Sequence, residues 1–286
     1  MPNTNKKINS KIDKYNHPWV FYTLSTLLPW TFWGVAAYLS HLEPASNSHI
    51  KWASFLGLVG LLMPAIIAFW LIHRDIGLQK DLFSRFFNFN SAKPVYLLLA
   101  LFLMPVSILL AQAISLLFGY SASQFQITGH YTFSSGVFPV WFLLILAPLI
   151  EELGWHTYGT DSLRSRFSLF KTSMIFALYW GIWHIPLSFI KDYYQSHLVD
   201  LGWIHSLNFL VSIFPFVIIM NWLYYKTNRN ILVAIVFHIT AGYFNEIFAT
   251  HPDSKIIQTV ILLFLATFIV IKNKSFYFSK EITNVQ

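Results

Sequence analysis

Long apolar stretches separated by short polar loops recur along the whole chain. Each stretch holds about 20 residues, which is the length an α-helix needs to cross the hydrocarbon core of a bilayer. Charged residues make up only 11% of the 286 residues, against about 25% in soluble domains. We therefore predict an all-α, polytopic membrane helix bundle of about eight transmembrane helices, at Trp19–Ser40, Trp52–Ile72, Pro94–Phe118, Val137–Tyr158, Thr172–Ile190, Trp203–Tyr225, Ile231–Phe248 and Ile256–Ile271.

The positive charges fall on alternate loops of this arrangement. Of the 19 Lys and Arg residues, 16 lie in the two terminal tails and in every second loop, and 3 lie in the other loops. Positive charge favours the cytoplasmic side, so both termini are predicted to be cytoplasmic. The same distribution explains the pI near 9.4 without a nucleic-acid partner, and none is expected.

Four segments follow from the predicted spans. Residues 1–17 form a cytoplasmic basic tail, 18–136 hold transmembrane helices 1–3, 137–250 hold core helices 4–7, and 251–286 hold the last span and a cytoplasmic tail. The loop His73–Lys93 is either an amphipathic helix on the cytoplasmic surface or a simple connector. The chain has no cysteine, which excludes disulfides, thiolate metal ligands and thiol catalysis.

A few strongly polar residues lie within the predicted spans. Acids and imidazoles at membrane depth cost free energy and usually mark function. Glu152 and His156 share a helix face at i, i+4, as do Trp180 and His184. His238, Gly242 and Asn245 form a stripe on the seventh span. These residues also have purely structural interpretations. The histidines and Asn221 would make packing contacts between helices, and Glu152 and Glu246 would lie at the membrane interface.

Adjacent acids at Glu151 and Glu152, with imidazoles from other helices, suit the hydrolysis of a peptide bond. A carboxylate can take a proton from water, and a second group can stabilise the oxyanion. A zinc site formed by Glu152, His156, His184 and His238 is the competing chemistry, although the HExxH pattern is absent. Serine catalysis lacks a G-x-S-x-G sequence.

Three motifs carry a family resemblance. EELGW at 151–155, WGIWHIP at 180–186 and VAIVFH at 233–238 resemble the CPBP intramembrane proteases, which include type II CaaX prenyl endopeptidases and bacteriocin-processing or Abi-like proteins. The family pattern is EExxxR, then FxxxH, then HxxxN. Here His156 stands for the Arg, Trp180 for the Phe and Gly242 for the Asn, with Asn245 one turn further along the same face.

The resemblance implies a role for each matching residue. Glu151 would activate water, His184 would help to hold that water, and His238 would help to stabilise the oxyanion. Glu152 would organise the site, with His156, Trp180 and Asn245 in support. No cofactor is expected on this glutamate-type mechanism, and zinc remains the alternative.

We therefore expect an intramembrane endopeptidase in a bacterial cytoplasmic membrane. Its partners would be the lipid bilayer and a peptide or lipidated protein substrate, admitted laterally or from the cytoplasm. The main alternative is a catalytically silent relative that acts as a bacteriocin-immunity or membrane-partner protein. A small transporter or lipid-modifying enzyme is a third class, which the lack of an internal repeat disfavours.

Overall fold

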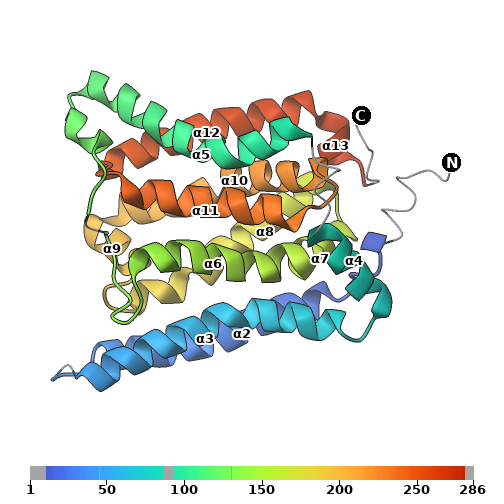
Figure 1. Ribbon diagram of the computed structural model, residues 1–286, viewed down its shortest axis with the longest axis horizontal. Coiled ribbons are helices and arrows are strands. Elements are labelled where there is room, and N and C mark those ends of the chain that lie inside the picture. The colour runs from blue at the N-terminus through green and yellow to red at the C-terminus, as the bar shows by residue number, and fades with distance from the viewer. Residues whose placement is uncertain (1–10, 45, 87–92, 130, 281–286) are drawn as a thin grey trace.

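The computed structural model describes residues 11–44, 46–86, 93–129 and 131–280, and within them the protein is a bundle of helices without a β-strand (Figure 1). The long helices are α2 (Pro18–Ser40), α3 (Asn47–Ile72), α5 (Pro94–Ser115), α6 (Val140–Gly154), α8 (Leu169–Trp183), α10 (Trp203–Lys226), α11 (Ile231–Ile247) and α12 (Pro252–Lys272). Shorter elements connect them: α4 (Ile76–Phe86), η2 (Leu116–Phe118), η3 (Ala122–Phe125), η4 (Trp155–Gly159), α7 (Thr160–Arg164), η5 (Ile185–Phe189), α9 (Tyr194–Leu201) and α13 (Lys274–Phe278).

All eight predicted spans lie on helices, which confirms the all-α membrane bundle. Five segments are long and apolar enough to cross a bilayer by length and composition: α3, α5 with η2, Val140–Arg164, α10 and α12. A sixth results if the bent pair Leu169–Phe189 and Tyr194–Leu201, which meet at 84°, is one span. Helix α11 is apolar but only 17 residues long. Helix α2 is rich in Trp, Tyr, Ser and Thr, which lower its mean hydropathy.

Helix α10 is an interior helix of the bundle and contacts α8, α11 and α12. Its side chains at Val217, Ile219, Met220 and Leu223 are fully buried. Large apolar side chains such as Phe264 and Trp203 are instead exposed on the outside. Such an exterior suits hydrocarbon, because a bilayer solvates apolar side chains while the helices satisfy their own backbone groups.

The two described ends of the chain lie at the same end of the bundle. At this end Arg164 of α7 donates to the carbonyl of Lys280, and Ser165, the residue after α7, donates to the carbonyl of Tyr15. In Figure 1 this end carries α4 and α7, and α9 lies at the opposite end. The position of both described chain ends on one side of the bundle agrees with the predicted topology. That this side is cytoplasmic remains a prediction.

The helical segment at the fourth predicted span is longer than the span that the apolar residues predict. The sequence places its end at Tyr158, but helical structure continues through the π-helical turn η4 and α7 to Arg164. The added residues include Thr160, Asp161 and Arg164, which are polar and nevertheless buried. Glu151 therefore lies near the middle of the 25-residue segment Val140–Arg164, rather than toward its end.

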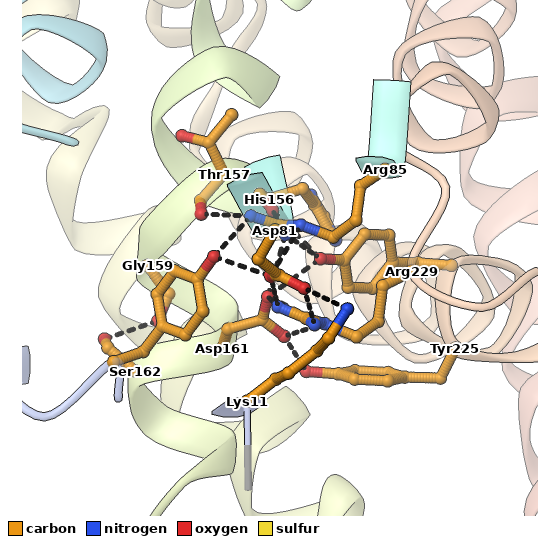
Figure 2. Close-up of polar contacts among 12 residues, drawn as sticks. Lys11, Asp81, Arg85, His156, Thr157, Gly159, Asp161, Ser162, Tyr225 and Arg229 are labelled. Atoms are coloured by element: carbon orange, nitrogen blue, oxygen red, sulfur yellow. Dashed lines mark hydrogen bonds and ion pairs between the residues drawn. The ribbon is translucent and has the colours of Figure 1, made fainter. Parts of the chain in front are cut away.

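The loop between α3 and α5 contains helix α4, which confirms a helix over part of His73–Lys93; residues 87–92 lie outside the described part. The polar side chains Asp81 and Arg85 of this helix are buried, at 4% and 2% exposure. A surface amphipathic helix would turn them to water. They instead form ion pairs inside the protein, which Figure 2 shows.

Candidate active site

The two adjacent acids of α6 have separate environments. The Glu151 carboxylate is held through one oxygen, Oε2, which accepts a hydrogen bond from the Trp180 indole at 2.9 Å and a longer one from the Trp155 indole at 3.4 Å. Both donors reach the same oxygen, so Oε1 is left for a water or a substrate. Trp155 follows Glu151 by one helical turn, and Trp180 comes from α8.

Glu152 is completely buried behind this position. Its Oε1 bonds to Nδ1 of His238 at 2.8 Å, and its Oε2 bonds to Nδ1 of His156. One carboxylate thus connects α6, the π-helical turn and α11. This arrangement confirms that Glu152 and His156 share a helix face, and it excludes an interfacial position for Glu152.

His156 is enclosed between α6, α8 and α10. Its Nε2 lies 3.0 Å from Oδ1 of Asn221, whose amide nitrogen donates to Ser173. Both ring nitrogens of His156 therefore contact oxygen atoms of the protein. Asn221 joins helices as expected, and it does so next to the site.

His184 directly follows the last residue of α8. Its Nδ1 lies 2.7 Å from the carbonyl oxygen of Trp180, and its ring packs edge-on against Trp183, with the ring centroids 5.1 Å apart. His238 packs edge-on against Trp180 at a similar centroid separation of 5.1 Å. Each of the two imidazoles has its Nδ1 fixed by an oxygen, so Nε2 is the nitrogen available for chemistry.

A cavity of about 350 Å³ brings five of the predicted residues together. Glu151, Trp180, His184, His238 and Asn245 all line it, as does Gly242, whereas Glu152 and His156 do not. The other walls are mainly apolar, with polar groups toward α9 and the start of α12, and include Leu58, Leu61, Met104, Leu144, Phe209, Ile213, Phe216 and Leu262.

The residues of the alternative zinc set are not gathered at one point. Among the described residues, no three His, Asp or Glu side chains are placed to hold a metal ion. The ring of His156 uses both nitrogens for hydrogen bonds to protein, and His184 lies on the cavity, where Glu152 does not reach. Within the described part of the chain, the side chains therefore do not fit the four-residue zinc site that the sequence left as an alternative.

Three features of the site differ from the sequence prediction or were not part of it. Glu246 is 4% exposed and pairs with Lys255, with 3.2 Å between the charged atoms, so the prediction of an interfacial acid is wrong. The indole of Trp155 was not predicted as a partner of Glu151, although its i, i+4 spacing from that acid is visible in the sequence. The π-helical turn has no sequence signal that we could read.

Comparison with known proteins identifies the family. Residues 133–244, which hold Glu151, His184 and His238, match the model of the Rce1-like type II CAAX prenyl endopeptidases. The chain is also 38% identical over 269 residues to CAAX prenyl protease 2 of the archaeon Methanococcus maripaludis, which covers 93% of this chain and 97% of that protein. The chain belongs to the Rce1-like family. It is an integral, multi-pass membrane protein of a peptidase family, and these comparisons give no support to a bacteriocin-immunity role.

Proposed function

We propose that this Rce1-like protein is an intramembrane endopeptidase in which Glu151 activates the attacking water. The observation that carries the proposal is the position of the Glu151 carboxylate, which faces the cavity with Oε2 fixed by two indoles. His184 and His238 line the same cavity. This set of groups is sufficient for acyl transfer to water.

The reaction starts with a water held between Oε1 of Glu151 and Nε2 of His184. Glu151 takes one proton from this water as the oxygen attacks the carbonyl carbon of the scissile bond. The negative oxygen of the tetrahedral intermediate accepts a hydrogen bond from Nε2–H of His238, whose ring Glu152 holds through Nδ1. Glu151 then gives its proton to the leaving nitrogen, the C–N bond breaks, and a carboxylic acid and an amine are released.

The proposed substrate is a membrane-associated peptide that carries an isoprenoid lipid near its carboxyl end. The relative in Methanococcus maripaludis is named as a CAAX prenyl protease, and the mainly apolar cavity walls of this chain would accommodate a lipid chain. The polar groups at Glu151, His184 and His238 stand at one place along these walls, which would restrict cleavage to one bond.

The test is cleavage of a farnesylated CaaX peptide by the purified protein in liposomes, with the product identified by mass spectrometry. Wild-type protein should release the terminal tripeptide, and Glu151→Gln should reduce the rate by about 1000-fold or more because the base is lost. The unprenylated peptide serves as the substrate control. Equal rates for wild type and Glu151→Gln would overturn the proposal.

Metal dependence is tested in the same assay. We propose that the reaction needs no metal ion, since the described side chains do not gather in a metal-binding group. Activity should then survive prolonged incubation with 1,10-phenanthroline and EDTA. Loss of activity that added zinc restores would instead establish a metal-dependent peptidase.

A further inference from the structure

A cluster of buried charges lies at the end of the bundle where the two described chain ends meet (Figure 2). Arg85 and Arg229 both pair with Asp161, at 2.9 Å and 2.5 Å between the charged atoms. Both also pair with Asp81, at 3.2 Å and 2.9 Å. The two arginines thus share the same two acids, and each of the four side chains is at most 5% exposed.

Arg85 has a second set of contacts that Arg229 lacks. Its Nη1 donates to the backbone carbonyl of His156 and its Nη2 donates to that of Thr157, both at 2.9 Å. Tyr224 of α10 also donates to the His156 carbonyl, at 3.0 Å. In Figure 2 the guanidinium of Arg85 lies directly against this stretch of backbone.

Both carbonyls belong to the π-helical turn Trp155–Gly159. In a π-helical turn the backbone hydrogen bonds run from i to i+5 instead of i to i+4, so the turn is wider than an α-helical one. Carbonyls buried without a donor are costly. The guanidinium donates to two successive buried carbonyls of this turn, and it so holds the turn in place.

Hydrogen bonds connect the π-helical turn to the proposed catalytic groups. The carbonyl that accepts from Arg85 belongs to His156, whose ring bonds to Glu152, and Glu152 bonds to His238 on the cavity wall. Glu151 is fixed mainly by the indole of Trp180 on α8, at 2.9 Å, and at the longer distance of 3.4 Å by Trp155, which is part of the turn. A change in the turn would therefore move Glu152 and His238 more than Glu151.

We propose that Arg85 is a positioning residue for the active site. From α4, which is not one of the membrane spans, it holds the π-helical turn and so fixes His156, Glu152 and, through them, the imidazole of His238. The inference rests on the proposed peptidase function. Without the guanidinium, the carbonyls of His156 and Thr157 would lose these two donors, and the turn could shift the His156 ring against Glu152.

The matched comparison is Arg85→Lys with Arg229→Lys, followed by Arg85→Met with Arg229→Met. Each pair removes a guanidinium from the same buried cluster, and the Lys variants keep the charge so that folding is retained. We expect kcat to fall by about tenfold or more in both Arg85 variants, with KM nearly unchanged, because misplacement of a reacting group slows the chemical step. Both Arg229 variants should keep kcat within about twofold of wild type, allowing for the spread of remote substitutions.

A second measurement reports on the turn without reference to activity. Hydrogen–deuterium exchange of peptides covering residues 155–161, measured in nanodiscs, should be faster in Arg85→Lys and unchanged in Arg229→Lys. Equal acceleration in the two variants would show a general structural role for the cluster. That result, or an unchanged kcat in both Arg85 variants, would overturn the proposal.

A double variant tests the route through His156. If Arg85 acts through this ring, Arg85→Lys combined with His156→Gln should be no slower than His156→Gln alone. If the rate losses of the two single variants multiply in the double variant, Arg85 acts independently of His156, and the proposed route through His156 is overturned. Wild-type protein and Glu151→Gln are run in parallel. If these two cleave at the same rate, the peptidase function itself fails, and a faster exchange confined to Arg85→Lys then leaves a purely structural clamp.

Discussion

At the scale of single residues, the adjacent acids Glu151 and Glu152 differ because neighbouring positions on a helix point about 100° apart. One carboxylate faces the cavity and the indoles, and the other faces the interior between helices. The pair therefore divides the work: one acid does the proposed chemistry and the other fixes a histidine. The two adjacent acids in the sequence do not by themselves show which of them has which role.

The indole of Trp180 sets the orientation of Glu151. Its Nε1 donates to Oε2 at 2.9 Å, so Trp180→Phe removes the donor while keeping an aromatic ring. A hydrogen bond to a charged group contributes about 1.5–3 kcal/mol, which corresponds to a loss of roughly 10- to 100-fold in kcat/KM. Initial rates on the farnesylated peptide measure it.

Trp33→Phe is the matched control for this prediction. Its Nε1 donates to the carbonyl of Gly57 at 3.0 Å, so the substitution loses a hydrogen bond of similar length that involves neither Glu151 nor the two histidines. We expect it to lower stability and to leave the rate per folded molecule close to wild type. Equal kinetic losses in the two variants would show that the bond to Glu151 has no special role.

Asp81 makes the buried charge cluster sensitive to acid. Burial alone would raise the pKa of its carboxyl, but the guanidinium groups of Arg229 and Arg85 hold this pKa at about 2. The unfolded value is about 3.9, so the pairing stabilises the folded protein above that pH. The stabilisation is lost as the pH falls from about 4 toward 2.

Asp81→Asn should remove this acid sensitivity. The variant should unfold at a lower temperature than wild type at pH 7, since a buried ion pair that loses one partner costs about 3 kcal/mol. Its midpoint should change less than that of wild type between pH 5 and pH 3. Thermal unfolding in detergent, followed by intrinsic fluorescence, measures both, and parallel curves for the two proteins would contradict the prediction.

At the scale of elements, α6 and α3 approach closely at Gly154. A methyl group there would lie 2.7 Å from Cβ of Pro64 and 2.8 Å from its backbone carbon. Because backbone atoms cannot rotate away, Gly154→Ala should force the helices apart and lower the free energy of unfolding by about 1–3 kcal/mol. The separation of the helices would also displace the turn that follows Glu152, so activity should fall together with stability.

Gly34→Ala is the control for this contact. It lies on the exposed side of α2, and no atom is within 4 Å of the added methyl group. Alanine is the better helix former by about 1 kcal/mol, so this variant should be as stable as wild type or slightly more stable. Thermal unfolding midpoints that shift together in the two variants would show that the contact with Pro64 is not responsible.

The sequence predicts some of the helical elements and not others. Apolar length located the eight helical segments, and i, i+4 spacing located the Glu152–His156 and Trp180–His184 pairs. The continuation of the helix from Tyr158 to Arg164 could not be read, because its polar residues are buried by partners far away in sequence, such as Arg85 and Arg229. A π-helical turn depends on the same distant donors, so the clamp on His156 was equally hidden.

At the scale of the whole molecule, the cavity extends from Glu151 toward the end of the bundle that carries α9. Its lining includes Tyr194, His205 and Lys255, whereas the described chain ends lie with α7 at the opposite end. The sequence predicts both cytoplasmic termini and an opening that is lateral or cytoplasmic. In this structure, the lining residues of α9 and the start of α12 lie on the side of the bundle opposite to the described chain ends.

The absence of cysteine allows a clean test of orientation. Lys80 in α4 and Asp200 in α9 are exposed at opposite ends of the bundle, so each can be replaced by a single Cys. If the charge distribution sets the topology, a membrane-impermeant maleimide should label Asp200→Cys in intact cells and Lys80→Cys only after permeabilisation. The reverse pattern would place both termini outside and the cavity opening inside.

The separation of the described chain ends from the α9 side of the cavity has a practical meaning for work with this protein. A fusion whose linker starts from the described ends begins on the side of the bundle away from Tyr194, His205 and Lys255 of the cavity lining. A substrate tethered there by a short linker would begin far from that part of the lining. Engineered delivery of a substrate should therefore start from the loops around α9.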